Sequence, residues 1–207
     1  MTAIIESVNV GLQRAVQHNG QTVQTGIWKE PVAGPVAVRG VNLDGDDQAD
    51  RSVHGGGDKA VYAYSAEDYE WWRGQLGREL APGTFGENLT LRGIDVNGAL
   101  IGERWRAGTA LLEVSEPRFP CWKLSTKMGD PTFLKTFARA MRLGAYLRIV
   151  EPGELRVGDA VEVVERPAHA VTIELFGRAY LHDRSLRPSV LAADALSARW
   201  REEFAAE

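Results

Sequence analysis

The one cysteine of this chain lies in the stretch Glu-Pro-Arg-Phe-Pro-Cys-Trp-Lys-Leu, residues 116–124. A thiolate is a nucleophile and a soft metal ligand, and nearby cations favour it over the thiol. Arg118 and Lys123 supply such cations, and two prolines restrict the backbone that carries them. The stretch therefore predicts a stiff, basic loop that presents Cys121. The alternative is a buried and inert cysteine packed beside the following tryptophan.

A glycine-rich stretch at residues 50–62 reads Asp-Arg-Ser-Val-His-Gly-Gly-Gly-Asp-Lys-Ala-Val-Tyr. Consecutive glycines let backbone N–H groups approach a ligand closely and form an anion-binding hollow. Arg51, His54 and Lys59 add charge and hydrogen-bond donors beside these glycines. The alternative is a tight turn whose polar residues face water. The stretch lacks the Gly-Lys-Ser/Thr ending of a nucleotide-triphosphatase phosphate loop.

A third polar stretch, Gly-Thr-Phe-Gly-Glu-Asn-Leu-Thr, occupies residues 83–90. Glu87 and Asn88 follow a glycine and precede an apolar position, which predicts the start of a strand. The amide offers a donor and an acceptor, and the carboxyl group offers an acceptor or a proton. The alternative is ordinary turn chemistry with a charge at the edge of a sheet.

A single thiolate admits several kinds of chemistry. Structural zinc needs about four ligands, and no Cys-His spacing in this chain provides them. A thiol hydrolase needs a base beside Cys121, for which His54 is the candidate. His18 lies in a polar stretch that indicates a solvated turn. A transition-metal site in which a cofactor supplies the other ligands needs only one protein thiolate, so it suits the lone cysteine best.

The elements that must position these residues are mainly short β segments separated by glycine and proline. Such a pattern is typical of a closed or nearly closed β-barrel. A helix over 65–76 is indicated by Ser65 as a cap, and a second is indicated over 131–143. We expect a barrel domain at residues 1–165, followed by a small module of two or three helices at residues 166–207. Segments predicted as strands are 5–10, 22–28, 36–41, 61–64, 88–91, 104–106, 110–115, 146–150 and 160–164.

Composition narrows the class of protein. Hydrophobic residues make up 44% and charged residues 25% of the 207 residues, which is ordinary for a globular protein. The net charge of −4 argues against binding of duplex nucleic acid. The chain has no apolar run of about 18 residues and its N-terminus does not read as a signal peptide, so we expect no membrane span. One cysteine excludes an internal disulfide and favours a cytoplasmic protein.

These stretches together resemble the MOSC domain, which is found at the C-terminal end of molybdenum cofactor sulfurases. The resemblance is greater to the bacterial stand-alone YiiM branch, which carries a three-helix module after the barrel. It spans nearly the whole chain, and its specificity comes from the order of its motifs together with the lone cysteine. The matching residues are Lys29, Pro31, Val32, Gly45, Asp46, Asp50, His54–Gly56, Asp58–Val61, Phe85–Leu89, Ile101–Glu103 and Pro117–Cys121.

The resemblance implies a cleft for the molybdenum cofactor (molybdopterin), a phosphorylated pyranopterin dithiolene, with Cys121 as the molybdenum ligand. It implies reduction of small N-hydroxylated substrates such as hydroxylaminopurine base analogues. Glu87, Asp58 and His54 are then candidate proton donors. No flavin, haem or iron–sulfur motif is present, so a separate electron-donor reductase is expected. The expected cofactor-binding residues are Lys29, Arg51, Gly55, Gly56, Lys59, Asn88, Arg118 and Arg148.

Two other functions stay open. Cys121 could carry a persulfide as a sulfur carrier or sulfurtransferase. The chain could also be a non-catalytic module in which the barrel binds an anion and the helical tail forms a homodimer. Pyridoxal phosphate binding is an expectation that comes only from association with the family.

Overall fold

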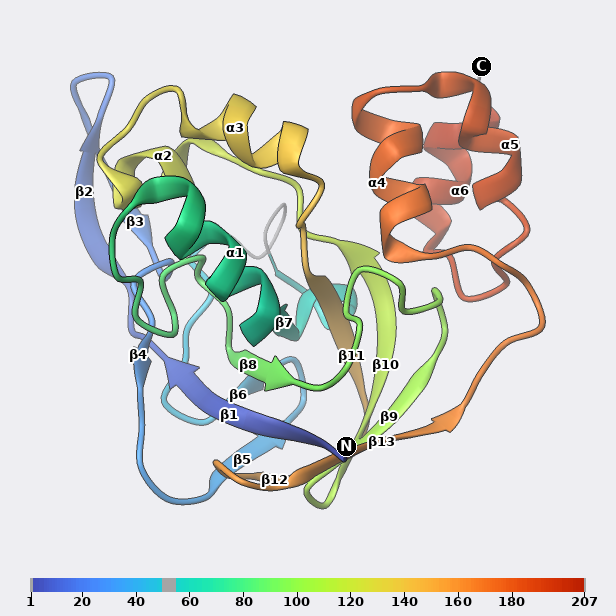
Figure 1. Ribbon diagram of the computed structural model, residues 1–207, viewed down its shortest axis with the longest axis horizontal. Helices are drawn as coiled ribbons and strands as arrows, with labels where there is room; N and C mark the ends of the chain where they lie inside the picture. The colour runs from blue at the N-terminus through green and yellow to red at the C-terminus, as the bar shows by residue number, and fades with distance from the viewer. Residues whose placement is uncertain (1, 50–54, 207) are drawn as a thin grey trace.

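The computed structural model describes residues 2–49 and 55–206. Within these residues, seven strands close into a barrel in the order β13-β9-β10-β11-β7-β8-β1, with β1 pairing back to β13 (Figure 1). Neighbouring strands are antiparallel except β7 and β8, which run parallel. The prediction of a mainly β-barrel fold with helices is thus confirmed. The barrel strands are β1 (Ala3–Val10), β7 (Val61–Ser65), β8 (Leu89–Arg92), β9 (Arg104–Ala107), β10 (Ala110–Pro117), β11 (Ala145–Glu151) and β13 (Ala160–Glu165).

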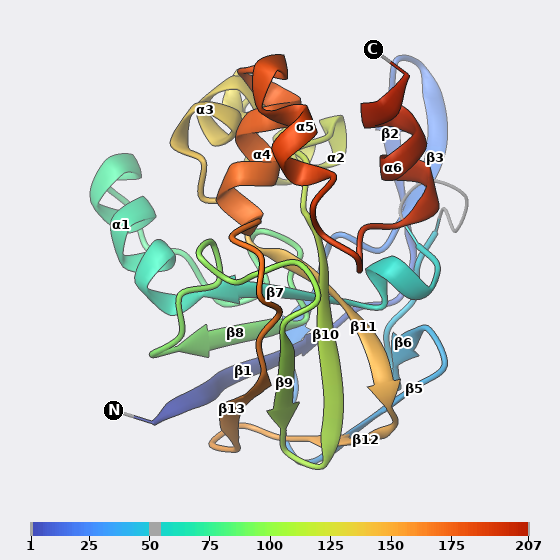
Figure 2. The same cartoon turned by 90° about the vertical axis from the view of Figure 1, so that its right-hand side faces the viewer.

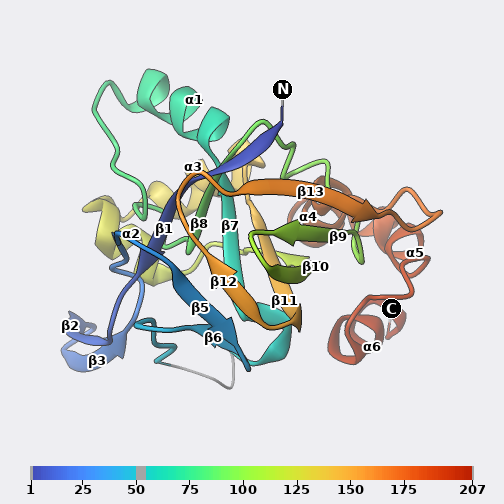
Figure 3. The same ribbon diagram turned by 90° about the horizontal axis from the view of Figure 1, so that it is seen from below.

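Shorter strands extend the barrel at its margins (Figure 3). A separate sheet has the order β12-β5-β6, and a two-stranded hairpin pairs β2 with β3. β4 pairs with the end of β1. The bounds are β2 (Arg14–His18), β3 (Gln21–Thr25), β4 (Glu30–Pro31), β5 (Val36–Arg39), β6 (Asn42–Leu43) and β12 (Gly153–Leu155).

The barrel forms because its strands carry apolar residues on the inward face. Leu89 and Leu91 are two residues apart on β8, so both point to the same side of the sheet, and both are fully buried. Trp105 fills the interior from β9, where its indole N–H donates to the Glu103 carboxylate at 2.7 Å. The barrel core therefore rests on alternating side chains from strands that are distant in sequence.

Three helices lie between the barrel strands: α1 (Ala66–Leu76), α2 (Trp122–Met128) and α3 (Phe133–Ala140). The α1 prediction is confirmed with its caps, because the Ser65 hydroxyl accepts backbone N–H groups of the first turn and Gly77 ends the helix in the left-handed conformation. The predicted helix at 131–143 is shorter than expected. It ends at Ala140, and the following Met141 adopts a positive φ of 53°. Helix α2 had no prediction of its own.

The C-terminal module contains α4 (Ile173–Leu181), the short 3-10 turn η2 (Arg184–Leu186), α5 (Arg187–Val190) and α6 (Ala198–Ala205) (Figure 2). A second 3-10 turn, η1 (Gly57–Lys59), precedes β7 in the barrel. Phe176, Trp200 and Phe204 are buried in one hydrophobic cluster with the barrel residues. The module is therefore packed on the barrel, as its small size requires. Among the described residues, the helices are all too short or too polar to cross a bilayer.

Candidate functional site

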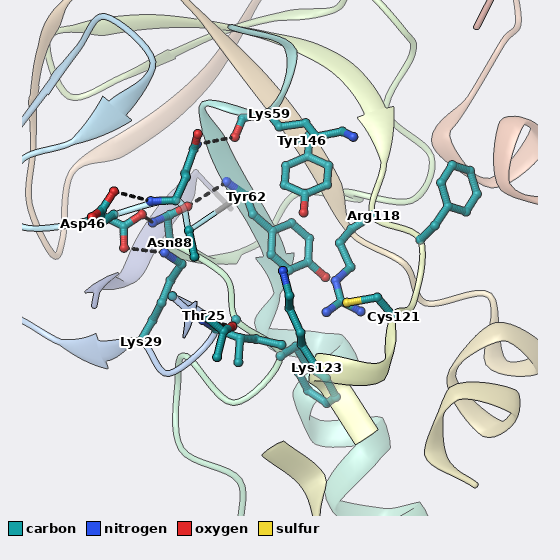
Figure 4. A pocket seen from close by; sticks show the side chains of 18 residues that line it. Thr25, Lys29, Asp46, Lys59, Tyr62, Asn88, Arg118, Cys121, Lys123 and Tyr146 are labelled. Atoms are coloured by element: carbon teal, nitrogen blue, oxygen red, sulfur yellow. Dashed lines mark hydrogen bonds and ion pairs between the residues drawn. The ribbon is translucent and has the colours of Figure 1, made fainter. Parts of the chain in front are cut away.

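A cavity with an empty volume of about 650 Å³, counting the part open to solvent, lies where several loops meet the ends of strands. Its walls come from the end of β3, the loop before η1, the start of β7, the loop before β8, the loop after β10, and β11 (Figure 4). The lining residues are Thr25, Gly26, Ile27, Lys29, Asp46, Asp47, Gln48, Ala49, Lys59, Tyr62, Phe85, Gly86, Asn88, Arg118, Phe119, Cys121, Lys123 and Tyr146.

Cys121 reaches this cavity from the turn that joins β10 to α2. Its backbone is extended, with φ −134° and ψ 165°, and its carbonyl accepts the Leu124 N–H at 2.9 Å. The thiol is half-buried and is not engaged as a helix cap. The structure thus places the sulfur on the cavity wall, rather than deep in apolar packing.

Arg118 lies beside the sulfur (Figure 4) and is only 4% exposed. Its Nη1 group is buried and has no hydrogen-bond partner among the residues that the structure describes. The guanidinium carbon lies 5.9 Å from the centre of the Tyr62 ring and 5.5 Å from that of Phe137, which are cation–π distances. Burial opposes the charge, but Cys121 and the surrounding tyrosines keep the pKa of Arg118 above its usual value. A buried N–H without a partner is costly, so an acceptor placed beside Nη1 would be bound favourably.

Two tyrosines form the wall next to this arginine. Tyr62 on β7 and Tyr146 on β11 are paired in the antiparallel register, and their rings lie 5.2 Å apart. The Tyr62 hydroxyl donates to the Leu143 carbonyl at 2.8 Å, so that ring is fixed. Burial raises the pKa of Tyr146 to about 12, which keeps its phenol protonated at neutral pH.

Lys59 and Lys123 add positive charge to the same wall. The Lys59 ammonium lies 3.3 Å from Glu116 Oε1 and 6.0 Å from the centre of the Tyr146 ring. Lys123 is 9% exposed and its side chain lines the cavity from α2. With Arg118, these residues make the cysteine side of the cavity electropositive.

The opposite wall is polar and nearly neutral. Lys29 and Asp46 form a buried ion pair, and Asp46 also accepts from the Asn88 amide at 3.0 Å and from the Gly11 N–H at 2.9 Å. Burial lowers the pKa of Lys29, although Asp46 opposes that shift. This wall therefore offers amide and carboxylate groups to a ligand, in contrast to the cationic wall beside Cys121.

Five of the residues expected at the site lie together on this cavity: Lys29, Lys59, Asn88, Arg118 and Cys121. Gly55 and Gly56 do not line it, although the Gly56 N–H is tied to the lining residue Gln48 at 3.3 Å. Arg51 and His54 lie outside the described residues.

Glu87 is fully buried and is not a cavity residue. Its Oε1 atom accepts from the Tyr69 hydroxyl at 2.6 Å, the Gly83 N–H at 2.6 Å and the Thr90 hydroxyl at 3.0 Å. Burial raises its pKa. This geometry makes Glu87 a buried support for the loop that precedes β8, off the cavity wall that carries Cys121.

Asp58 and Arg148 also lie off the cavity, where they pair with each other at 2.6 Å. Arg148 further donates to Glu113 at 2.8 Å and to the Ala195 carbonyl at 2.9 Å. Asp58 and Glu113 belong to the barrel domain, and Ala195 belongs to the helical module. The arginine therefore ties the module to the barrel, and its donors point away from the cavity.

Sequence reasoning did not select Tyr62, Tyr146 or Lys123 as site residues. The two tyrosines occupy strands whose residues read as ordinary core, and only the pairing of β7 with β11 brings them beside Arg118. Lys123 was identified only as a positive charge that follows Cys121. The sequence did not show toward which side its side chain points. Helical geometry in α2 turns it into the cavity.

The fold is a β-barrel with a cavity that a lone cysteine lines, and comparison with family models identifies the family to which such a chain belongs. Residues 50–162 match the MOSC domain, so this chain belongs to the MOSC domain family. At the level of the family, that membership associates it with the molybdenum cofactor and with oxidoreductase-type function.

Among individual relatives, YflK of Bacillus subtilis is 35% identical over 96% of this chain and 91% of that protein. The crystal structure of YiiM from Geobacillus stearothermophilus has a TM-score of 0.80, with 34% identity over 99% of this chain and 98% of that one. A protein of Gibberella moniliformis named a reductase is 35% identical over 72% of this chain, and the matched part is 27% of the fungal protein.

Proposed function

We propose that this protein binds the molybdenum cofactor in the Cys121 cavity and reduces N-hydroxylated compounds. The observation that carries the proposal is the cavity itself: the chain's lone thiol opens into it beside a buried Arg118, whose Nη1 has no partner within residues 2–49 and 55–206. Membership of the MOSC family and the fungal relative named a reductase support the same reading.

The residues present fit this cofactor. A phosphorylated pyranopterin dithiolene carries anionic oxygens and sulfurs, and the wall beside Cys121 carries Arg118, Lys123 and Lys59. Among the residues that the structure describes, no group of three or more His, Cys, Asp or Glu side chains could hold a metal ion. A dithiolene supplies soft ligands of its own, so one protein thiolate is enough.

Each wall would hold a different part of the cofactor. Cys121 would provide the thiolate ligand to molybdenum, and Arg118 with Lys123 would neutralise the charge next to it. Asp46, Gln48 and Asn88 on the opposite wall would offer oxygen acceptors to a polar heterocycle, because the amide N–H groups of Gln48 and Asn88 already donate within the protein. When bound, the cofactor supplies two-electron chemistry that accepts an oxygen from an N–O bond.

The side chains of this protein would then bind the substrate, orient it and supply protons to it. Reduction of an N-hydroxyl group to an amine consumes two electrons and two protons and releases water. Tyr146 presents a protonated phenol on the cavity wall, next to the fixed Tyr62 ring. Phe85 and Phe119 line the cavity with apolar surface that keeps water from the reacting groups. Electrons come from a separate reductase, and we expect the protein to act in the cytoplasm, where a lone thiol stays reduced.

The test uses protein expressed in hosts with and without a cofactor-synthesis pathway. Molybdenum and pterin are measured per chain, and hydroxylaminopurine reduction is assayed with an artificial electron donor. Wild-type protein from the competent host is expected to contain both groups and to reduce the substrate. Cys121→Ser is expected to lose activity, whereas Thr126→Ser, on the exposed side of α2, keeps it.

The outcomes separate the rival functions. Folded wild-type protein that lacks pterin and activity from both hosts would remove the reductase proposal. A persulfide on Cys121, detected by mass spectrometry and transferred to an acceptor, would instead support a sulfur carrier. Unchanged anion binding and unchanged cellular phenotype in Cys121→Ser would support a non-catalytic module.

A further inference from the structure

The C-terminal module contacts the barrel through a polar link that is buried at both ends. Trp200 on α6 donates its indole N–H to Glu116 Oε2 at 3.0 Å. Trp200 is 2% exposed and Glu116 is 3% exposed. A hydrogen bond to a buried carboxylate is stronger than one between neutral groups, so this contact fixes the carboxylate in one orientation.

The other oxygen of the same carboxylate pairs with a residue of the cavity wall. Glu116 Oε1 lies 3.3 Å from the ammonium of Lys59, which is a lining residue next to Tyr146 (Figure 4). Burial raises the pKa of Glu116, and Lys59 and Trp200 oppose that shift. The charged and titratable groups around Glu116 are Lys59, Asp58 and Tyr146. The module therefore reaches the cavity charge through a chain of two contacts.

We propose that Trp200 is a positioning residue for the cavity: by holding Glu116, it sets the place of the Lys59 ammonium and thus the preference of the cavity for anions. The inference concerns the cavity of the protein itself and does not require the reductase activity. It gives the helical module a part in the site, although none of the module's described residues lines the cavity.

The geometry indicates how loss of the Trp200 indole N–H would change the preference of the cavity for anions. Without the indole N–H, Glu116 Oε2 is a buried acceptor that has lost its donor. The Lys59 ammonium carries three N–H groups on a flexible stem and already touches the same carboxylate, so it is the donor best placed to compensate. We expect it to move toward Glu116 and away from the cavity, which weakens the attraction for anions.

The lone cysteine makes this measurable without the cofactor. Cys121 is alkylated with iodoacetate, which is anionic, and with iodoacetamide, which is neutral, at pH 8 and low salt. The ratio of the two rate constants reports the local preference for an anion, because changes in thiolate fraction or access affect both reagents. Lys59→Met is expected to lower the ratio by about two- to fivefold, the size expected of one partly screened charge.

Trp200→Phe keeps an aromatic ring in the cluster but removes the donor, and it is expected to lower the ratio in the same direction. In the Lys59→Met background, Trp200→Phe should have no further effect, because the two act through one path. Phe204→Leu is the control: it loosens the same helix, in which Phe204 packs on Trp200 with ring centroids 5.6 Å apart, without touching Glu116.

Three outcomes would overturn the inference. The ratio of Trp200→Phe could equal that of wild type, its effect could persist in full in the Lys59→Met background, or Phe204→Leu could lower the ratio as much. Failure of cofactor binding would leave this measurement intact, so the inference and the proposed function can fail separately.

Discussion

His18 stacks on Trp122, with ring centroids 3.8 Å apart and an angle of 11° between the ring planes. His18 ends β2 and Trp122 directly follows Cys121, so the stack joins the hairpin to the cysteine turn. The polar sequence around His18 indicated a solvated turn. The structure instead gives the imidazole an aromatic partner, and β3 leads from the hairpin to the lining residue Thr25.

The hairpin is expected to depend on this stack. Two strands alone are barely stable in water, and this hairpin projects beside α2 (Figure 1). His18→Ala should therefore increase amide hydrogen exchange across Arg14–Thr25 by about fivefold, equivalent to about 1 kcal/mol of local stability. Gln21→Ala, at an exposed position of the same hairpin, is the control and should change exchange little. Equal exchange in His18→Ala and wild type would show that the stack adds nothing.

Lys127 predicts a pH effect on stability. Its ammonium donates to the carbonyls of Ile27 at 2.8 Å and Gly83 at 2.5 Å, and burial lowers its pKa to about 8. Between pH 8 and the unfolded value near 10.5, the unfolded chain holds the proton that the folded chain has released. The unfolding free energy of wild type should therefore rise with pH in that window.

The comparison that isolates this effect uses Lys127→Met, which has no proton to release. Over the same window, the unfolding free energy of wild type should rise relative to that of the variant in urea titrations. Lys135→Met, on the exposed side of α3, should follow wild type. A constant difference between wild type and Lys127→Met from pH 7 to 10.5 would contradict the lowered pKa.

Replacement of Arg118 is expected to have opposite effects on the stability of the fold and on cofactor binding. The guanidinium of Arg118 is buried and its Nη1 group has no hydrogen-bond partner in the described part of the chain, so its charge is incompletely compensated. Replacing such a cation with an apolar residue of similar length is often neutral or stabilising. Arg118→Met should keep or raise the unfolding free energy, by about 1 kcal/mol, and should abolish retention of pterin in protein from a cofactor-producing host.

The matched control is Arg148→Met. Arg148 pairs with Asp58 and Glu113 and donates to the Ala195 carbonyl, so its removal loses three contacts and should cost about 2 kcal/mol, although Glu113 keeps its pairing with Arg104. If its donors point away from the cavity, as the structure has them, pterin retention should survive. Loss of stability in Arg118→Met as large as in Arg148→Met would show that Arg118 is mainly structural.

Gly144 predicts a steric cost at the start of β11. A Cβ atom there would lie 2.6 Å from the Ala63 carbonyl oxygen and 2.8 Å from the Tyr62 ring, and φ is +67°. Gly144→Ala should lower the unfolding free energy by about 3 kcal/mol. Gly129→Ala has nearly the same φ, +68°, but meets nothing within 4 Å, so it should cost only about 1 kcal/mol. Thermal or urea unfolding measures both variants. Equal losses of unfolding free energy in Gly144→Ala and Gly129→Ala would show that the cost comes from the backbone conformation alone and not from the steric contacts.

Local chemistry explains the parts of the fold that could be predicted. Ser65 and Gly77 bound α1 because a cap hydroxyl and a left-handed glycine act within one turn of the helix. The positions of the barrel strands and of β3 and β5 followed from apolar alternation and glycine turns, with errors of a few residues at their ends, whereas β2, β4, β6 and β12 were not predicted. Helices α2 and α3 were missed or misjudged because short helices draw their stability from packing rather than from propensity.

The sequence by itself determined a barrel of short strands with a helical tail, and a stiff basic turn around Cys121, because these depend on neighbours along the chain. Only the tertiary structure decided which polar residues share the cavity. It brought Tyr62 and Tyr146 beside Arg118, and it turned Glu87 and Arg148 toward other partners. The reason is physical: a shift of one residue in strand pairing sends a side chain to the opposite face of the sheet, and that register is set by distant strands.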